Sequence, residues 1–202
     1  MNDRPSATST PDLARLVPVV ARRMAAHVQH GRRHLLTEDV LRWATIDALV
    51  DGGVAPARLA VEEVIPGRRG KLDLVVLSHP PTAIEFKFPR DSRTGISPDT
   101  MTLGELLKDV YRLASLDGFG ERWAVMFLND RLCRFLSRRT DCRWSFVVGE
   151  RLMFNPAAFA VLPKTASSQL VEWQEATATA ECVVVETVTG HRLLGYRVET
   201  TL

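Results

Sequence analysis

The stretch from Lys71 to Arg90 reads KLDLVVLSHPPTAIEFKFPR and contains two short apolar runs joined by a Pro-Pro turn. Each run has the length and composition of a buried strand. Asp73 interrupts the first run, and Glu85 and Lys87 interrupt the second. A charge buried in an apolar strand is unfavourable by several kcal/mol unless a partner compensates for it. These three charged residues therefore indicate that the two strands carry a functional site as well as part of the hydrophobic core.

The spacing of these residues on the strands predicts how they meet. Side chains two residues apart on a strand point to the same face, so Glu85 and Lys87 share a face and Phe86 points the other way. If the two strands pair in a hairpin, Asp73 joins them. Two carboxylates and one ammonium group then converge at one place on a sheet. Carboxylate oxygens are the ligands that Mg²⁺ prefers, so this arrangement predicts a divalent cation site.

The rest of the chain alternates periodic apolar segments with turn residues. The pattern predicts helices over residues 11–28, 38–51, 101–116 and 129–139, strands over 59–66, 71–77, 82–88, 122–128 and 144–148, and a hairpin of 181–188 with 192–200. Hairpin-linked strands followed by a helical crossover favour an α/β fold with a mixed sheet and helices on both faces.

The same pattern suggests how the chain is divided. We expect an N-terminal arm and basic helix in residues 1–35, a core in 36–148, and a C-terminal extension in 149–202 whose β-hairpin packs on the same domain.

Composition places the chain among ordinary globular proteins. It has 202 residues, 46% hydrophobic and 25% charged, with a formal net charge of +2. Its three cysteines, Cys133, Cys142 and Cys182, are odd in number and widely spaced, which predicts free thiols in a reducing compartment. Residues 1–10 are polar and no long apolar segment follows, so we expect no signal peptide, no membrane span and a cytoplasmic location.

Basic residues near the central stretch are candidates for nucleic-acid contact. The glycine-flanked tip Gly67–Gly70 carries two arginines that would reach away from the sheet. The candidates are Arg68, Arg69, Arg90, Lys108 and Arg112. The N-terminal helix is also rich in arginine, where a phosphate contact and a solvated helix face explain the pattern equally well.

The spacing of the charged residues resembles a known superfamily. Asp73, a gap of eleven residues, and then Glu85-Phe86-Lys87 follow a helix that starts with the acidic Glu38. This pattern resembles the PD-(D/E)xK nuclease superfamily, whose αβββαβ core has the element order expected here for residues 36–130. The position before Asp73 is Leu72 and not proline, a common departure. Residues 108–113, KDVYRL, resemble the second-helix segment of several families in this group.

The resemblance implies a role for each residue. Asp73 and Glu85 would be direct metal ligands, with the backbone carbonyl of Phe86 as a third. Glu38 would hold a second ion or a metal-bound water. Lys87 would orient the attacking water and stabilise developing negative charge. The ion would be Mg²⁺, with Mn²⁺ as a substitute, and its chemistry suits phosphodiester hydrolysis.

The predicted function is therefore a metal-dependent endonuclease. DNA is favoured as the substrate, with a role in restriction or phage defence, and a symmetric homodimer would suit cleavage of both strands. One alternative is a nuclease-fold protein that binds nucleic acid or a partner protein without cleaving, and another is an RNA-cleaving effector. The sequence contains no G-x-S-x-G elbow, P-loop or Cys-His nucleophile motif that would favour another enzyme class.

Overall fold

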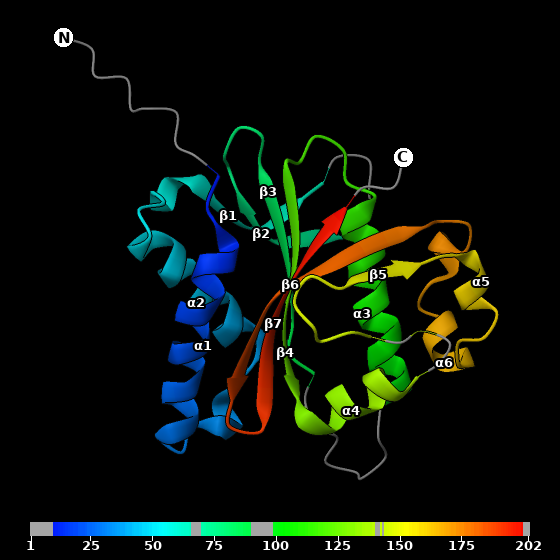
Figure 1. The fold of residues 1–202 in the computed structure, drawn as a ribbon. Coiled ribbons are helices and arrows are strands. Elements are labelled where there is room, and N and C mark those ends of the chain that lie inside the picture. Colours follow the sequence, from blue (N-terminus) through cyan, green and yellow to red (C-terminus); the bar gives the residue numbers. More distant parts are fainter. Residues whose placement is uncertain (1–9, 66–69, 90–98, 140–141, 143, 200–202) are drawn as a thin grey trace.

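The computed structural model describes residues 10–65, 70–89, 99–139, 142 and 144–199. Within these residues the chain forms an α/β fold in which helices cover both faces of one seven-stranded mixed sheet (Figure 1). The α/β fold class and the mixed sheet predicted from the sequence are thereby confirmed.

The sheet has the strand order β1-β2-β3-β4-β7-β6-β5. Strands β3 and β4 are parallel, and every other neighbouring pair is antiparallel. The strands are β1 (Leu59–Val64), β2 (Lys71–Val76), β3 (Thr82–Lys87), β4 (Glu121–Asn129), β5 (Arg151–Phe154), β6 (Ala178–Val188) and β7 (His191–Glu199).

Helices precede the sheet, connect its parallel strands and cover it. They are α1 (Leu13–Gln29), α2 (Glu38–Asp51), α3 (Asp99–Ala114), α4 (Asp130–Arg138), α5 (Pro156–Phe159) and α6 (Lys164–Ser167), with short 3₁₀ turns at Arg33–Leu35, Pro56–Arg58 and Val171–Trp173. The sequence α2-β1-β2-β3-α3-β4 reproduces the order expected for residues 36–130.

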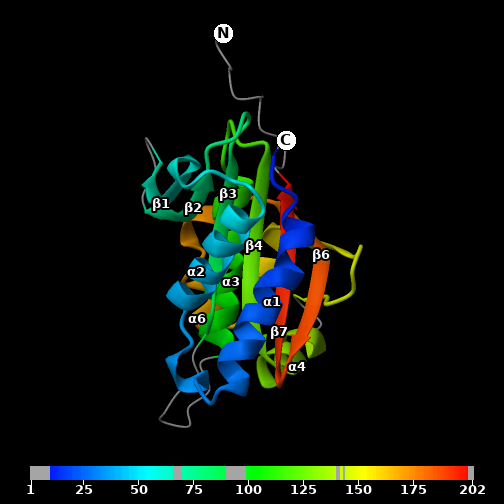
Figure 2. The ribbon, with the colours of Figure 1, turned by 90° about the vertical axis from the view of Figure 1, so that its left-hand side faces the viewer.

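Strand β4 shows how the two hydrophobic layers are divided. Alternate side chains of a strand point to opposite faces of the sheet. The side chains on one face of β4 pack with α1 and α2; they are Trp123, Val125 and Phe127. The side chains on the other face pack with α3, α4 and α6; they are Ala124, Met126 and Leu128. Figure 2, viewed from the side of α1 and α2, shows α3 behind them.

The C-terminal hairpin is an integral part of the sheet. Strand β7 pairs with β4 over His191–Arg197, and β6 continues the sheet on the other side of β7 (Figure 1). Helix α1 packs on the face of this hairpin through Val17, which contacts the cluster containing Val184 and Leu193. The N-terminal helix and the C-terminal hairpin thus share one core with the central strands.

The strand predicted for residues 144–148 is wrong. These residues form an irregular segment, and the strand of this region is β5 at Arg151–Phe154. Trp144 is fully buried against Phe154 and Tyr196, whereas Val147 and Val148 are exposed. The apolar run therefore anchors a loop through one tryptophan, and it does not alternate between two faces.

Within the described ranges, no helix combines the length and the apolar content needed to span a bilayer.

Gly104 provides a test of the packing between α3 and α6. A methyl group on its Cα would lie 2.7 Å from the carbonyl oxygen of Ala166 and 2.9 Å from the Ala166 Cα. Alanine normally stabilises a helix by about 1 kcal/mol relative to glycine. Here overpacking against backbone, which typically costs about 1–3 kcal/mol, should outweigh that gain. We expect Gly104→Ala to lower the free energy of unfolding in urea titrations.

The exposed Met101 on the same helix supplies the control. Met101→Ala adds helix propensity without a close contact, so its free energy of unfolding should change by no more than about 0.5 kcal/mol. A Gly104→Ala protein as stable as Met101→Ala would show that α6 does not press against α3.

Candidate active site

The register of β2 and β3 places Asp73 opposite Glu85. The strands pair Val75 with Ala83 and Leu74 with Ile84, and one further step along the antiparallel register joins the two acidic residues. Opposite residues on one face have Cβ atoms about 4.5–5.5 Å apart. At this step the backbone N–H of Phe86 donates to Asp73 Oδ2 at 2.7 Å. The convergence of Asp73 and Glu85 expected from the sequence is therefore present.

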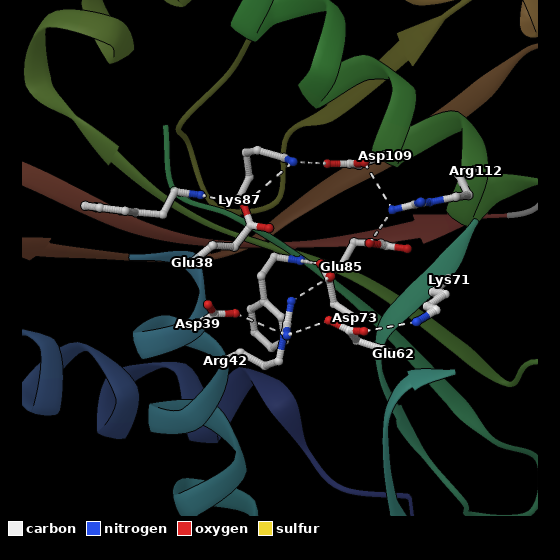
Figure 3. Close-up of polar contacts among 12 residues, drawn as sticks. Glu38, Asp39, Arg42, Glu62, Lys71, Asp73, Glu85, Lys87, Asp109 and Arg112 are labelled. Atoms are coloured by element: carbon white, nitrogen blue, oxygen red, sulfur yellow. Dashed lines mark hydrogen bonds and ion pairs between the residues drawn. The ribbon is translucent and has the colours of Figure 1, made fainter. Parts of the chain in front are cut away.

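Glu38 reaches the same place from the first turn of α2. Thr37 caps this helix by accepting a hydrogen bond from the N–H of Val40 at 3.2 Å. Glu38 Oε2 accepts from the N–H of Phe88 at 3.3 Å and lies 3.7 Å from Lys87 Nζ. Glu38 thus ties the start of α2 to the end of β3, as Figure 3 shows.

Lys87 lies between two carboxylates. Its Nζ is 3.1 Å from Asp109 Oδ2 as well as 3.7 Å from Glu38 Oε2. Burial alone would lower the pKa of Lys87, but the attraction of Asp109 and Glu38 exceeds this effect and raises it above the ordinary value. Lys87 is therefore an ammonium group throughout the neutral pH range.

Helix α3 contributes Asp109 and Arg112, which lie one turn apart. Arg112 Nη2 is 2.5 Å from Glu85 Oε2 and 3.3 Å from Asp109 Oδ1. Arg112 was expected to contact nucleic acid, and in this structure its guanidinium is directed at Glu85 (Figure 3).

The other basic candidates are placed as follows. Lys108, on the same helix, is half-buried and has no ion pair with any residue that the structure describes. Arg68, Arg69 and Arg90 lie outside the described residues.

Arg42 on α2 is a site residue that sequence reasoning missed. Its Nη2 lies 3.0 Å from Asp73 Oδ1, and its Nη1 lies 3.2 Å from Asp39 and 3.7 Å from Glu62. Its side chain is only 11% exposed, so the pairing with Asp73 is shielded from water.

A signal for these missed residues was present in the helices. Asp39 with Arg42, and Asp109 with Arg112, are oppositely charged pairs at i, i+3 spacing, which places each pair on one helix face. Asp109 is buried among apolar neighbours of α3, which sets it apart from a solvated surface charge. The sequence alone does not show that both pairs face the same strands.

The charges of the site do not balance. Four carboxylates face three cations, a formal charge of −1; the acids are Glu38, Asp73, Glu85 and Asp109, and the bases are Arg42, Lys87 and Arg112. Glu85 is 2% exposed. Burial raises the pKa of Glu85 well above its ordinary value, Arg112 opposes the shift, and Asp109 and Asp73 add to it. Burial also raises the pKa of Asp109 and of Glu38.

The site offers the carboxylate oxygens that a metal cation prefers, but these oxygens are not arranged around a common point. Across the described ranges, no group of three or more His, Cys, Asp or Glu residues is disposed to hold a metal ion. Arg42 and Arg112 neutralise the two carboxylates instead. Both oxygens of Glu85 are nevertheless buried without a hydrogen bond of regular geometry to any described residue. Hard oxygen donors with excess negative charge fit Mg²⁺ or Mn²⁺, with Asp73 and Glu85 as the nearest ligand pair.

No protein-family model matches the chain, and no curated protein or solved structure matches it either. The functional assignment that follows is accordingly based on the residues of the site itself.

The raised pKa of Glu85 predicts that this residue destabilises the folded chain at neutral pH. Between the unfolded and the folded pKa, the folded chain binds more protons than the unfolded one, so the contribution of Glu85 to stability falls as the pH rises. We expect Glu85→Gln to be more stable than the parent at pH 8 and the difference to shrink toward pH 4, because glutamine resembles the protonated side chain that the folded chain favours. Urea denaturation across this pH range measures it.

Glu63, an exposed carboxylate on the edge strand β1, provides the matched control. Glu63→Gln should leave the pH dependence of stability unchanged. A Glu85→Gln protein that is less stable than the parent at pH 8 would contradict the inferred cost of the buried charge.

Proposed function

We propose that the chain is a metal-dependent nuclease whose restriction-endonuclease-like core is formed by α2, β1 to β3, α3 and β4. One observation carries this proposal. Asp73 and Glu85 lie opposite each other on adjacent strands, and Lys87 follows two residues later on the Glu85 face. The element order and the parallel pairing of β3 with β4 through α3 support the same assignment.

Asp73 and Glu85 would hold the Mg²⁺ ion, and Glu38 and the backbone carbonyl of Phe86 would complete the protein ligands. When bound, the ion supplies charge neutralisation at the phosphate and activation of a water molecule. Its charge would also relieve the repulsion between Asp73 and Glu85, which the two arginines offset in the structure.

Lys87 has a more restricted role than a general base. Because Asp109 and Glu38 raise the pKa of Lys87, it carries a proton at neutral pH and can only donate hydrogen bonds. It would orient the attacking water and stabilise the negative charge that develops on the phosphate. Asp109 would act through Lys87 as a positioning residue, since its Oδ2 lies 3.1 Å from the ammonium nitrogen.

DNA is the proposed substrate, and a symmetric homodimer would allow cleavage of both strands, in keeping with a role in restriction or phage defence. A second candidate is a protein of the same fold that binds nucleic acid or a partner without cleaving. The pairing of both carboxylates with arginines favours this candidate, because Arg42 and Arg112 stand in the place of a cation. An RNA-cleaving enzyme would use the same residues as a DNA-cleaving one.

A cleavage assay on four substrates distinguishes these functions. The protein is incubated with single- and double-stranded DNA and RNA in Mg²⁺, Mn²⁺ or EDTA. We expect metal-dependent cleavage, strongest on DNA, that falls at least about 100-fold in Asp73→Ala, Glu85→Ala and Lys87→Ala, because ligands and ammonium act as a unit. EDTA should abolish it.

Glu63→Ala removes an exposed carboxylate from β1 and should cleave as fast as the parent protein. Cleavage that persists in EDTA or in Asp73→Ala would place the chemistry elsewhere. Binding of DNA with no cleavage in any of the metals would support the non-cleaving alternative. Cleavage of RNA and not of DNA would support the RNA-cleaving enzyme.

A further inference from the structure

Helix α4 presents a row of arginines that the proposed catalytic site does not use. Arg131, Arg134 and Arg138 are exposed, and Arg139 follows directly after the helix. With Phe135 they line an open cavity of about 800 Å³, which is completed by Asp99 of α3 and by Val161.

Two arginines of this cavity are held in place by their neighbours. Arg131 Nη1 donates to both carboxylate oxygens of Asp99, at 2.9 and 2.7 Å. The guanidinium of Arg139 lies over the ring of Phe135, 5.6 Å from its centroid. Arg134 and Arg138 have no acidic partner among the residues that the structure describes. Among the described residues, the cavity therefore combines two guanidiniums that are held by neighbours with two that are not paired with an acid.

Stability of the helix does not explain this composition. Arg134 and Arg138 are four residues apart on one helix face, where like charges destabilise a helix by about 0.2–0.5 kcal/mol. The helix dipole favours a cation at Arg138, in the last turn, but disfavours one at Arg131, in the first turn. The arrangement costs folding energy, which is expected of a surface built to receive an anion.

The charge and the residue type identify the ligand as a chain of phosphates. Four arginines and one carboxylate give the cavity a formal charge of +3. A guanidinium group can donate two parallel hydrogen bonds to the oxygens of one phosphate. Several arginines along one helix face therefore suit a polymer with repeating phosphates better than they suit an isolated phosphate ion. An open cavity also admits a polymer that passes through it.

Helix α3 connects this cavity with the proposed catalytic site. Asp99 starts the helix in the cavity, and Asp109 contacts Lys87 ten residues later. At 1.5 Å per residue the two positions are about 15 Å apart along the helix axis. With about 3.4 Å of duplex axis per phosphate of one strand, this separation corresponds to roughly four or five nucleotides.

We propose that the arginine cavity of α4 binds the phosphate backbone of the nucleic-acid substrate about four or five nucleotides from the cleaved bond. The placement relative to the cleaved bond rests on the proposed nuclease function, whereas the binding of backbone phosphates does not.

The test measures DNA binding without metal, so that it is independent of cleavage. Binding of a fluorescently labelled DNA duplex to the full chain is followed by anisotropy in EDTA across a KCl series. Each phosphate contact adds about 0.9 to the slope of log affinity against log salt. We expect Arg134→Ala/Arg138→Ala to reduce that slope by about 1.8 and to weaken binding at least 10-fold at low salt.

Arg151→Ala/Arg197→Ala is the charge-matched control. Both arginines are exposed, but each is already paired with an acidic side chain, Arg151 with Glu199 and Arg197 with Glu181, and neither lines the cavity of α4. This pair removes the same two charges and should leave the slope unchanged. Thermal denaturation of both double variants confirms that they fold.

Three results would overturn the proposal: equal slopes in the two double variants, wild-type protein that fails to bind DNA, or arginine-dependent binding to phosphatidylserine vesicles or poly-glutamate with no effect on DNA. A different result would contradict the nuclease function alone. In that case the Arg134→Ala/Arg138→Ala protein shows the reduced salt slope, but the parent protein cleaves no substrate in any metal.

Discussion

Two carboxylates held opposite each other on antiparallel strands, Glu85 buried and Asp73 half-buried, are the constraint on which the site depends. Asp73 and Glu85 are fixed there by the register of β2 and β3, which the buried hydrophobic face of these strands does not allow to slip. Like charges at such a distance in a poorly solvated place require compensation. The compensation comes from Arg42 on α2 and Arg112 on α3, so both helices must lie against this end of the sheet.

The arrangement stores free energy in the folded chain. Glu85, Asp109 and Glu38 all have a raised pKa because burial disfavours their charged forms, and three cations do not fully offset four acids. A fold optimised for stability alone would replace these groups with apolar residues. Excess negative charge in a poorly solvated place instead favours the binding of a cation, because a bound cation relieves the repulsion among the carboxylates.

Local features of the sequence were sufficient to predict the strands and the face on which Asp73, Glu85 and Lys87 meet. Alternation fixes which side chains share a face, and the Pro-Pro turn joins the two strands that must pair. Arg42 and Asp109 were not predicted as site residues because their roles depend on how α2 and α3 pack across the sheet. Residues 144–148 were misread because Trp144 is buried from a loop, which has the same composition as a strand.

The position of the C-terminal hairpin could not be read from local pattern either, and it has a consequence for the site. By pairing with β4, strand β7 makes β4 a central strand, and β4 in turn is the parallel neighbour of β3. Strand β3 pairs with β4 over Thr82–Lys87, which includes Glu85 and Lys87, whereas its pairing with β2 covers Thr82–Ile84. Because β4 is itself held between β3 and β7, this pairing keeps the side chains of Glu85 and Lys87 in fixed positions. The last third of the chain, which carries no recognisable catalytic residue, thus contributes rigidity to a site more than fifty residues away in sequence.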